Sequence, residues 1–159
     1  MWWRRLRYVL VLIALCSIAT CPAAKRACTA KQRTREADDL LEYLADRVAA
    51  SIATTGHVPP TAAGPTPLPT CCEVGGTCDP DPATWAEPGW QALQFSIDAE
   101  YRYTYSYLPD PGGRSAVVRA VGDLDCNGES SLYEIQIAID PSDSNRGVSR
   151  TWTRKQRYE

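Results

Sequence analysis

The stretch that decides the fold is Asp123-Leu124-Asp125-Cys126-Asn127-Gly128-Glu129-Ser130-Ser131-Leu132-Tyr133-Glu134. It fits the calcium-loop pattern D-x-[DN]-x-[DN]-G-x5-E at every constrained position. Oxygen-bearing side chains fall at loop positions one, three, five and nine, and a carboxylate falls at position twelve. Glycine stands at position six, where the chain must turn sharply. The flanking residues lack helical periodicity, so the pattern predicts a metal-pinned loop between two strands.

The candidate metal is Ca²⁺, which takes about 6–8 oxygen ligands, and one short loop supplies most of them. The alternative is an acidic turn that binds no metal. The candidate calcium ligands are the side chains of Asp123, Asp125, Asn127, Ser131 and Glu134, with the backbone carbonyl of Glu129.

Strand-like alternation surrounds this loop. Four tyrosines, at positions 101, 103, 105 and 107, alternate with polar residues, which is the period of a β-strand. We interpret them as a sheet face buried against a helix, and a carbohydrate-binding stripe is the alternative. The sequence predicts an antiparallel meander of about four strands within residues 91–159, the later strands covering residues 115–121, 133–139 and 148–152.

Residues 29–55 have the pattern of an amphipathic helix. Apolar residues recur at spacings of three and four, and Gly56 followed by Pro59-Pro60 ends the pattern. The predicted apolar stripe consists of Ala37, Leu41, Leu44, Val48 and Ile52.

Residues 56–90 are predicted to form a loop rich in proline and cysteine. Its prolines exclude long helices and long strands. The chain contains seven cysteines, which favour disulfides if the protein is exported and metal or redox sites if it stays in the cytosol.

Residues 1–28 favour export. A basic, aromatic start precedes an uncharged run over residues 8–24, which as a helix would span about 26 Å, just short of a hydrocarbon core of about 30 Å. A cleaved signal peptide, a retained anchor and a lipid-modified Cys21 all stay open. With export, the disulfide candidates are Cys71, Cys72, Cys78 and Cys126, whose pairing allows three connectivities.

The order of these segments resembles bacterial type IV pilin-like proteins, in particular minor pilins and pseudopilins. Three motifs carry the resemblance: Trp85-x-x-Pro88-x-Trp90-x-x-Leu93-x-Phe95, the tyrosine strand of residues 101–107, and Ala120-Val-Gly122-Asp123-Leu-Asp125-Cys-Asn127-Gly128. The resemblance implies an α+β fold. In it a long N-terminal helix, made of a membrane segment and an amphipathic half, packs on a roughly four-stranded antiparallel sheet.

The chain departs from that family at two places. It lacks the G-F-x-x-x-E prepilin processing motif before its apolar run, which indicates a divergent or non-polymerising relative. Cys126 replaces the glycine usual at loop position four, and the resemblance suggests that it ties the loop to Cys72 or Cys78.

The resemblance implies a structural subunit of a type IV pilus-like or type II secretion-like assembly. Its partners would be other pilin-like subunits and the inner membrane, reached through residues 8–24, with the sheet domain in the periplasm or at the cell surface. The alternative is an exported, non-polymerising binding module. The net charge of -2 argues against nucleic acid, and the single histidine, His57, has no catalytic pattern around it, so we expect neither an enzyme nor a small-molecule substrate.

Overall fold

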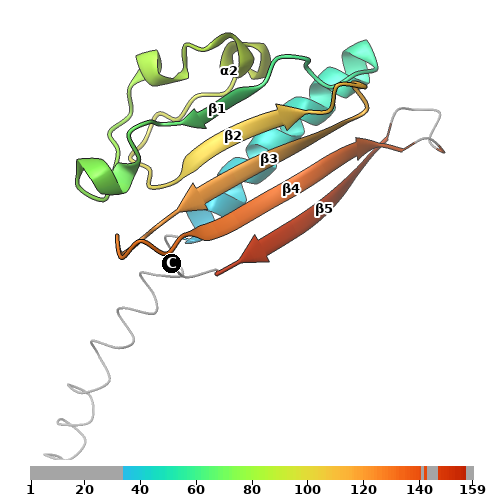
Figure 1. Cartoon of the computed structure of the whole chain (residues 1–159). Helices are drawn as coiled ribbons and strands as arrows, with labels where there is room; N and C mark the ends of the chain where they lie inside the picture. Colours follow the sequence, from blue (N-terminus) through green and yellow to red (C-terminus); the bar gives the residue numbers. More distant parts are fainter. Residues whose placement is uncertain (1–33, 141, 143–146, 157–159) are drawn as a thin grey trace, which may run out of the picture. The chain divides into compact units, whose positions relative to one another are not determined.

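Residues 34–159 form one compact unit, of which the computed structural model describes residues 34–140, 142 and 147–156. Its centre is a five-stranded sheet in the order β1-β2-β3-β4-β5, with every neighbouring pair antiparallel (Figure 1). The strands are β1 (Ala63–Thr66), β2 (Thr104–Pro109), β3 (Ser115–Gly122), β4 (Ser131–Ile139) and β5 (Val148–Lys155).

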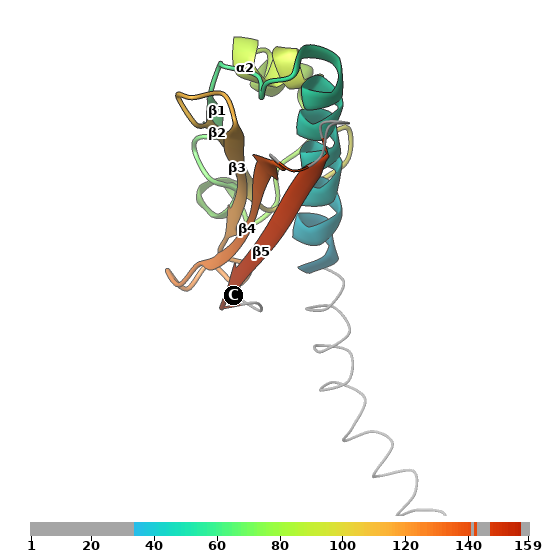
Figure 2. The ribbon, with the colours of Figure 1, turned by 90° about the vertical axis from the view of Figure 1, so that its right-hand side faces the viewer.

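One helix, over residues 34–55, lies along a single face of this sheet (Figure 2). We call this the inner face and the opposite one the outer face. The segment between β1 and β2 contains three short helices, η1 (Cys71–Val74), η2 (Pro82–Trp85) and α2 (Pro88–Leu93). Prolines at the first turns of η2 and α2 are compatible with these positions, where the missing N–H has no helical partner.

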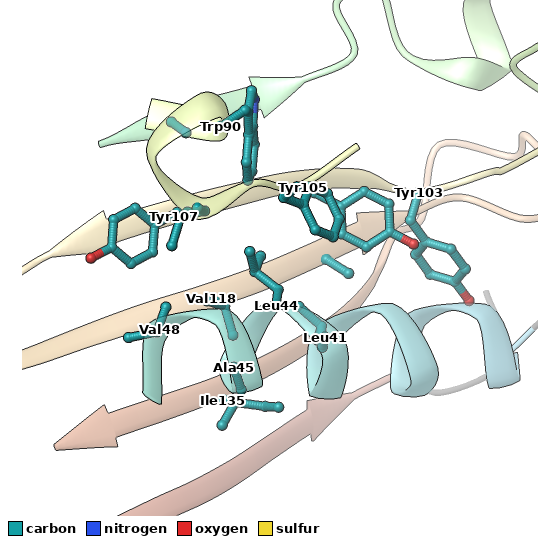
Figure 3. Close-up of a cluster of buried hydrophobic side chains, with 14 of the residues drawn as sticks. Leu41, Leu44, Ala45, Val48, Trp90, Tyr103, Tyr105, Tyr107, Val118 and Ile135 are labelled. Atoms are coloured by element: carbon teal, nitrogen blue, oxygen red, sulfur yellow. The ribbon is translucent and has the colours of Figure 1, made fainter. Parts of the chain in front are cut away.

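The core lies between the 34–55 helix and the inner face of the sheet (Figure 3). All five residues of the predicted apolar stripe are fully buried, and the four tyrosines of residues 101–107 are at most 1% exposed. Burial of the tyrosine row confirms its interpretation as a core face. Alternating residues of the next two strands complete the layer: Ala116, Val118, Ala120, Tyr133, Ile135 and Ile137.

Aromatic rings close one end of the core. Trp85 meets Trp90 and Phe95 edge to face, at centroid distances of 5.4 and 5.3 Å. Such pairs contribute about 0.5–1.5 kcal/mol beyond the area that they bury. The Trp90 indole donates a hydrogen bond of 2.9 Å to Thr66 Oγ1, which ties α2 to β1. The tryptophans of the sequence motif are therefore core residues.

Polar contacts fasten β5 to the helix. Arg150 bonds Glu42 and Asp46, at 3.0 and 2.6 Å, and the Trp152 indole donates to Glu42 at 3.0 Å. Arg154 pairs with Asp38 and lies 3.7 Å from the centre of the Trp152 ring. The acids of the helix are four residues apart and so share one helix face, and their partners in β5 are two residues apart and so share one strand face. The row of acids therefore lies against the row of partners. Both arginines of β5 are thus engaged within the fold.

The structure corrects the predicted fold in two respects. The sheet has five strands instead of about four, because β1 forms inside the 56–90 segment and pairs with β2. Pro65 is tolerated in β1 because this strand lies at the sheet edge and has a neighbour on one side only.

The second correction concerns the helix. The helix that the structure describes begins at Thr34 and ends at residue 55, so the predicted long helix with a membrane segment is not shown. The sheet covers the apolar stripe of this helix. The predicted anchor of residues 1–28, with its membrane segment 8–24, lies outside the described residues. Among the residues that are described, no helix is both long and apolar enough to span a membrane.

Candidate metal loop and the groove beside it

The loop between β3 and β4 is closed at its base by the strand ladder. Gly122, the last residue of β3, pairs with Ser131, the first of β4. The Ser131 hydroxyl is fully buried and donates to the Gly122 carbonyl at 2.9 Å. Ser131 therefore fastens the two strands together in this structure.

Three of the predicted ligands lie together above this base. The Asp123 carboxylate accepts hydrogen bonds from the backbone N–H groups of Asn127 and Gly128, at 3.1 and 2.8 Å. Asn127 donates through Nδ2 to Asp125, at 3.1 Å, and accepts through Oδ1 from the Glu129 N–H, at 2.7 Å. These bonds draw two carboxylates and one amide into the same turn.

Gly128 makes the turn possible. Its φ of 96° lies in the left-handed region, which side chains with a Cβ rarely adopt. A Cβ added there would meet no atom within 4 Å. The position therefore requires glycine for its backbone angle, as the pattern predicted, and not for space.

The sixth predicted ligand, Glu134, lies elsewhere. It stands opposite Arg119 in the β3–β4 ladder, on the outer face of the sheet. Arg119 Nε and Nη2 both donate to one of its oxygens, at 3.0 and 2.7 Å. The structure thus groups Asp123, Asp125 and Asn127 and leaves Ser131 and Glu134 with other partners. Across the described ranges, no three His, Cys, Asp or Glu side chains gather as a metal site.

Two disulfides fix the surroundings of the loop. Cys72 bonds Cys126, with their Cα atoms 5.5 Å apart, and Cys71 bonds Cys78, with their Cα atoms 5.1 Å apart. The first joins η1 to the candidate metal loop, one of the two links that the resemblance suggested. The second closes the short segment that contains η1.

A groove of about 560 Å³ lies on the outer face of the sheet, and residues of the 56–90 segment and of the β3–β4 loop line it. Pro65 of β1 and Leu68 after it line the groove on the side of the 56–90 segment. The other strands contribute Leu108, Arg119 and Val121, and the β3–β4 loop contributes residues 123, 128 and 130. Leu68 and Leu108 are 68% and 43% exposed. The groove therefore combines apolar side chains with one arginine and the acidic loop.

Sequence reasoning missed one half-buried acid. Glu36, near the start of the described helix, accepts hydrogen bonds from the backbone N–H of Arg102 and the hydroxyl of Tyr105, at 2.7 and 3.3 Å. Burial raises the pKa of this carboxyl above its ordinary value, although these bonds and the Arg102 guanidinium oppose the shift. In the sequence, Glu36 is marked only by its position next to the apolar stripe of the helix. Exposed acids of the same helix lie next to the stripe as well, so this position does not identify the acid that becomes half-buried.

The chain matches no protein-family model, no curated protein and no solved structure.

Proposed function

We propose that the protein is a membrane-anchored structural subunit of a type IV pilus-like or type II secretion-like assembly, with a calcium-stabilised domain in the periplasm. The observation that carries this proposal is the cluster of Asp123, Asp125 and Asn127 in a loop that joins two core strands. The resemblance of the three sequence motifs supports the kind of assembly. The two disulfides support an oxidising compartment outside the cytosol.

The donor chemistry of the loop fits calcium. Two carboxylates and an amide oxygen are hard ligands, and the turn at Gly128 already holds them close. A bound cation would neutralise the repulsion between Asp123 and Asp125 and so fix the loop ahead of β4. Glu134 and Ser131 stand outside this set in the structure, because Glu134 pairs with Arg119 and Ser131 bonds the Gly122 carbonyl.

A melting experiment tests the calcium part of the proposal. The full chain, stripped with a chelator, is heated with increasing calcium and, in parallel, with magnesium. Ligand at one hundred times its dissociation constant stabilises the folded state by about 2.7 kcal/mol, so we expect the melting temperature to rise with calcium and less with magnesium. An unchanged melting temperature at millimolar calcium would contradict the proposed site.

The assembly part needs a separate experiment. Mass spectrometry of the protein isolated from membranes shows whether residues 1–24 are retained, and cross-linking in cells shows its neighbours. We expect a retained anchor and cross-links to other pilin-like subunits. A mature chain that has lost residues 1–24 and remains monomeric would overturn this assignment.

The groove on the outer face favours a second candidate, an exported binding module that does not polymerise. It presents exposed Leu68 and Leu108, a surface that suits an apolar partner. Under this reading, substitution of Leu108 by aspartate abolishes partner capture and leaves anchoring unchanged. If the protein is instead a subunit of an assembly, its function requires the membrane anchor.

A further inference from the structure

The two disulfides differ in how far solvent reaches them. Cys71 and Cys78 are buried, at 2% and 7% exposure, whereas Cys126 is exposed and Cys72 is half-buried. Thiol–disulfide exchange begins with the attack of a thiolate on an accessible sulfur atom. A reductant in solution therefore reaches the Cys72–Cys126 bond through Cys126, while the core shields the Cys71–Cys78 bond.

The accessible disulfide also occupies a particular place in the fold. It joins η1, which lies within the 56–90 segment, to the β3–β4 loop, and residues of both regions line the outer groove. Cys72 itself lines the groove, as do Asp123 and Gly128. The bond links residues that are 54 apart in the sequence, so it holds together walls that the chain connects only through β2 and β3.

The rest of the fold has its own attachments and does not depend on this bond. Cys71–Cys78 and the backbone bridge between Cys78 and Tyr101 tie η1 to the segment that leads into β2. Leu124 packs on the core, and the hydrogen bond from Ser131 to Gly122 closes the loop base. The segment that the Cys72–Cys126 bond alone fixes covalently is therefore the loop tip, residues 125–130.

We propose that the Cys72–Cys126 disulfide is a redox-sensitive latch, which opens one wall of the outer groove while Cys71–Cys78 stays closed. A thiolate of a dithiol reductant attacks Cys126 Sγ, the Sγ–Sγ bond breaks, and Cys72 leaves as a thiolate that takes up a proton. The second thiol of the reductant then displaces Cys126, which also becomes a thiol. The protein gains two electrons and two protons, and the reductant leaves as its own disulfide.

The first test measures the order in which the two bonds open. The full chain is incubated with increasing dithiothreitol, its free thiols are alkylated, and each cysteine peptide is quantified by mass spectrometry. We expect the Cys72 and Cys126 peptides to be alkylated at a reductant concentration at least roughly tenfold lower than the Cys71 and Cys78 peptides. Equal concentrations, or the reverse order, would overturn the latch.

The second test measures what the opened bond releases. Amide hydrogen exchange is compared between the wild type and a double variant carrying Cys72→Ser and Cys126→Ser. We expect faster exchange in residues 125–130 and unchanged exchange in β4. The matched control carries Cys71→Ser and Cys78→Ser, in which we expect the change around η1 instead. Unchanged exchange at the loop tip of the first variant would refute the proposal.

A third comparison covers the case in which the serine variant does not fold. Wild-type protein that is reduced only at Cys72 and Cys126, at the reductant concentration found in the first test, gives the same exchange measurement without any substitution. Both measurements are made on chelator-stripped protein, so that no calcium bound in the loop alters either readout. A chain that binds no calcium but opens its latch selectively would therefore refute the calcium site and support the latch.

Discussion

Arg119 faces Glu134 across the β3–β4 ladder and directs two hydrogen bonds, of 3.0 and 2.7 Å, at a single carboxylate oxygen. This pair holds the acid that the calcium-loop pattern assigns to position twelve. The guanidinium is thus placed as the competitor of any cation that Glu134 would bind. The competition is open to experiment.

Replacement of Arg119 by glutamine should strengthen the response to calcium. Glu134 loses its partner and becomes available as a ligand, so the calcium concentration that produces half of the melting shift should fall. The control is Arg114→Gln, which removes the same charge from an exposed residue at the other end of β3. An equal response of both variants would show that Glu134 is not a ligand.

Replacement of Asp125 by asparagine should weaken the response to calcium, because the loop loses one of the two carboxylates that attract the cation. We expect the half-saturating calcium concentration to rise at least about tenfold, as is common when a charged ligand is lost. Asp110→Asn is the matched control, because Asp110 accepts its hydrogen bond from Gly112 in the distant β2–β3 turn. Calorimetric titration of both variants measures the difference, and identical affinities would contradict the site.

The half-buried Glu36 predicts a pH dependence of the stability. Its pKa is raised in the folded state by burial, so the folded chain holds more protons than the unfolded chain between the two pKa values. The free energy of unfolding should therefore fall as pH rises through that window, by about 1.4 kcal/mol for each unit of pKa difference. In Glu36→Gln this contribution should vanish. The free energy of unfolding of both proteins is measured by denaturation between about pH 4 and pH 7. The same pH dependence in the wild type and in Glu36→Gln would contradict the prediction.

The core should depend strongly on Leu44, which is fully buried between the helix and the sheet (Figure 3). Leu44→Ala should lower the free energy of unfolding by about 2–5 kcal/mol, because it removes apolar contacts and leaves a cavity. Leu68→Ala is the matched control at a residue 68% exposed, and it should change stability by about 0.5 kcal/mol or less. Similar losses in urea denaturation would place Leu44 outside the core.

The ion pair between Arg150 and Asp46 should contribute little. Their side chains are 27% and 66% exposed, so water and salt screen the attraction. A double-mutant cycle with Arg150→Ala and Asp46→Ala should give a coupling below about 1 kcal/mol that shrinks further in high salt. A larger coupling that resists salt would show that β5 depends on this pair for its attachment.

Most of the sheet and the helix follow from periodicity. Two patterns place apolar or aromatic residues on one side only: the stripe from Ala37 to Ile52 and the tyrosine row. Each pattern predicts which face is buried, even when the element that packs against that face is not known. Strands β2 to β5 come from the same alternation. Periodicity fails for β1, because four residues with a central proline carry no repeat. That strand forms through its pairing with β2, a tertiary contact that local sequence does not encode.

The candidate site was predictable to the extent that it is local. Asp123, Asp125, Asn127 and Gly128 lie within six residues, and the turn that brings them together is set by the glycine. Glu134 was assigned to the same site by spacing alone, whereas the structure pairs it with Arg119, whose position depends on strand register. The resemblance left two partners open for Cys126, Cys72 or Cys78, because the choice between them depends on how the 56–90 segment folds over the sheet.

The sheet presents two unequal borders. β1 is four residues long, contains Pro65 and pairs with β2 in an irregular register, whereas β5 offers eight consecutive residues at the opposite margin. Backbone groups along such a margin are templates for an incoming extended chain, and proline removes a donor from that template. Of the two borders, β5 therefore offers the longer run of strand backbone, and β1 offers a short one that lacks the donor of Pro65.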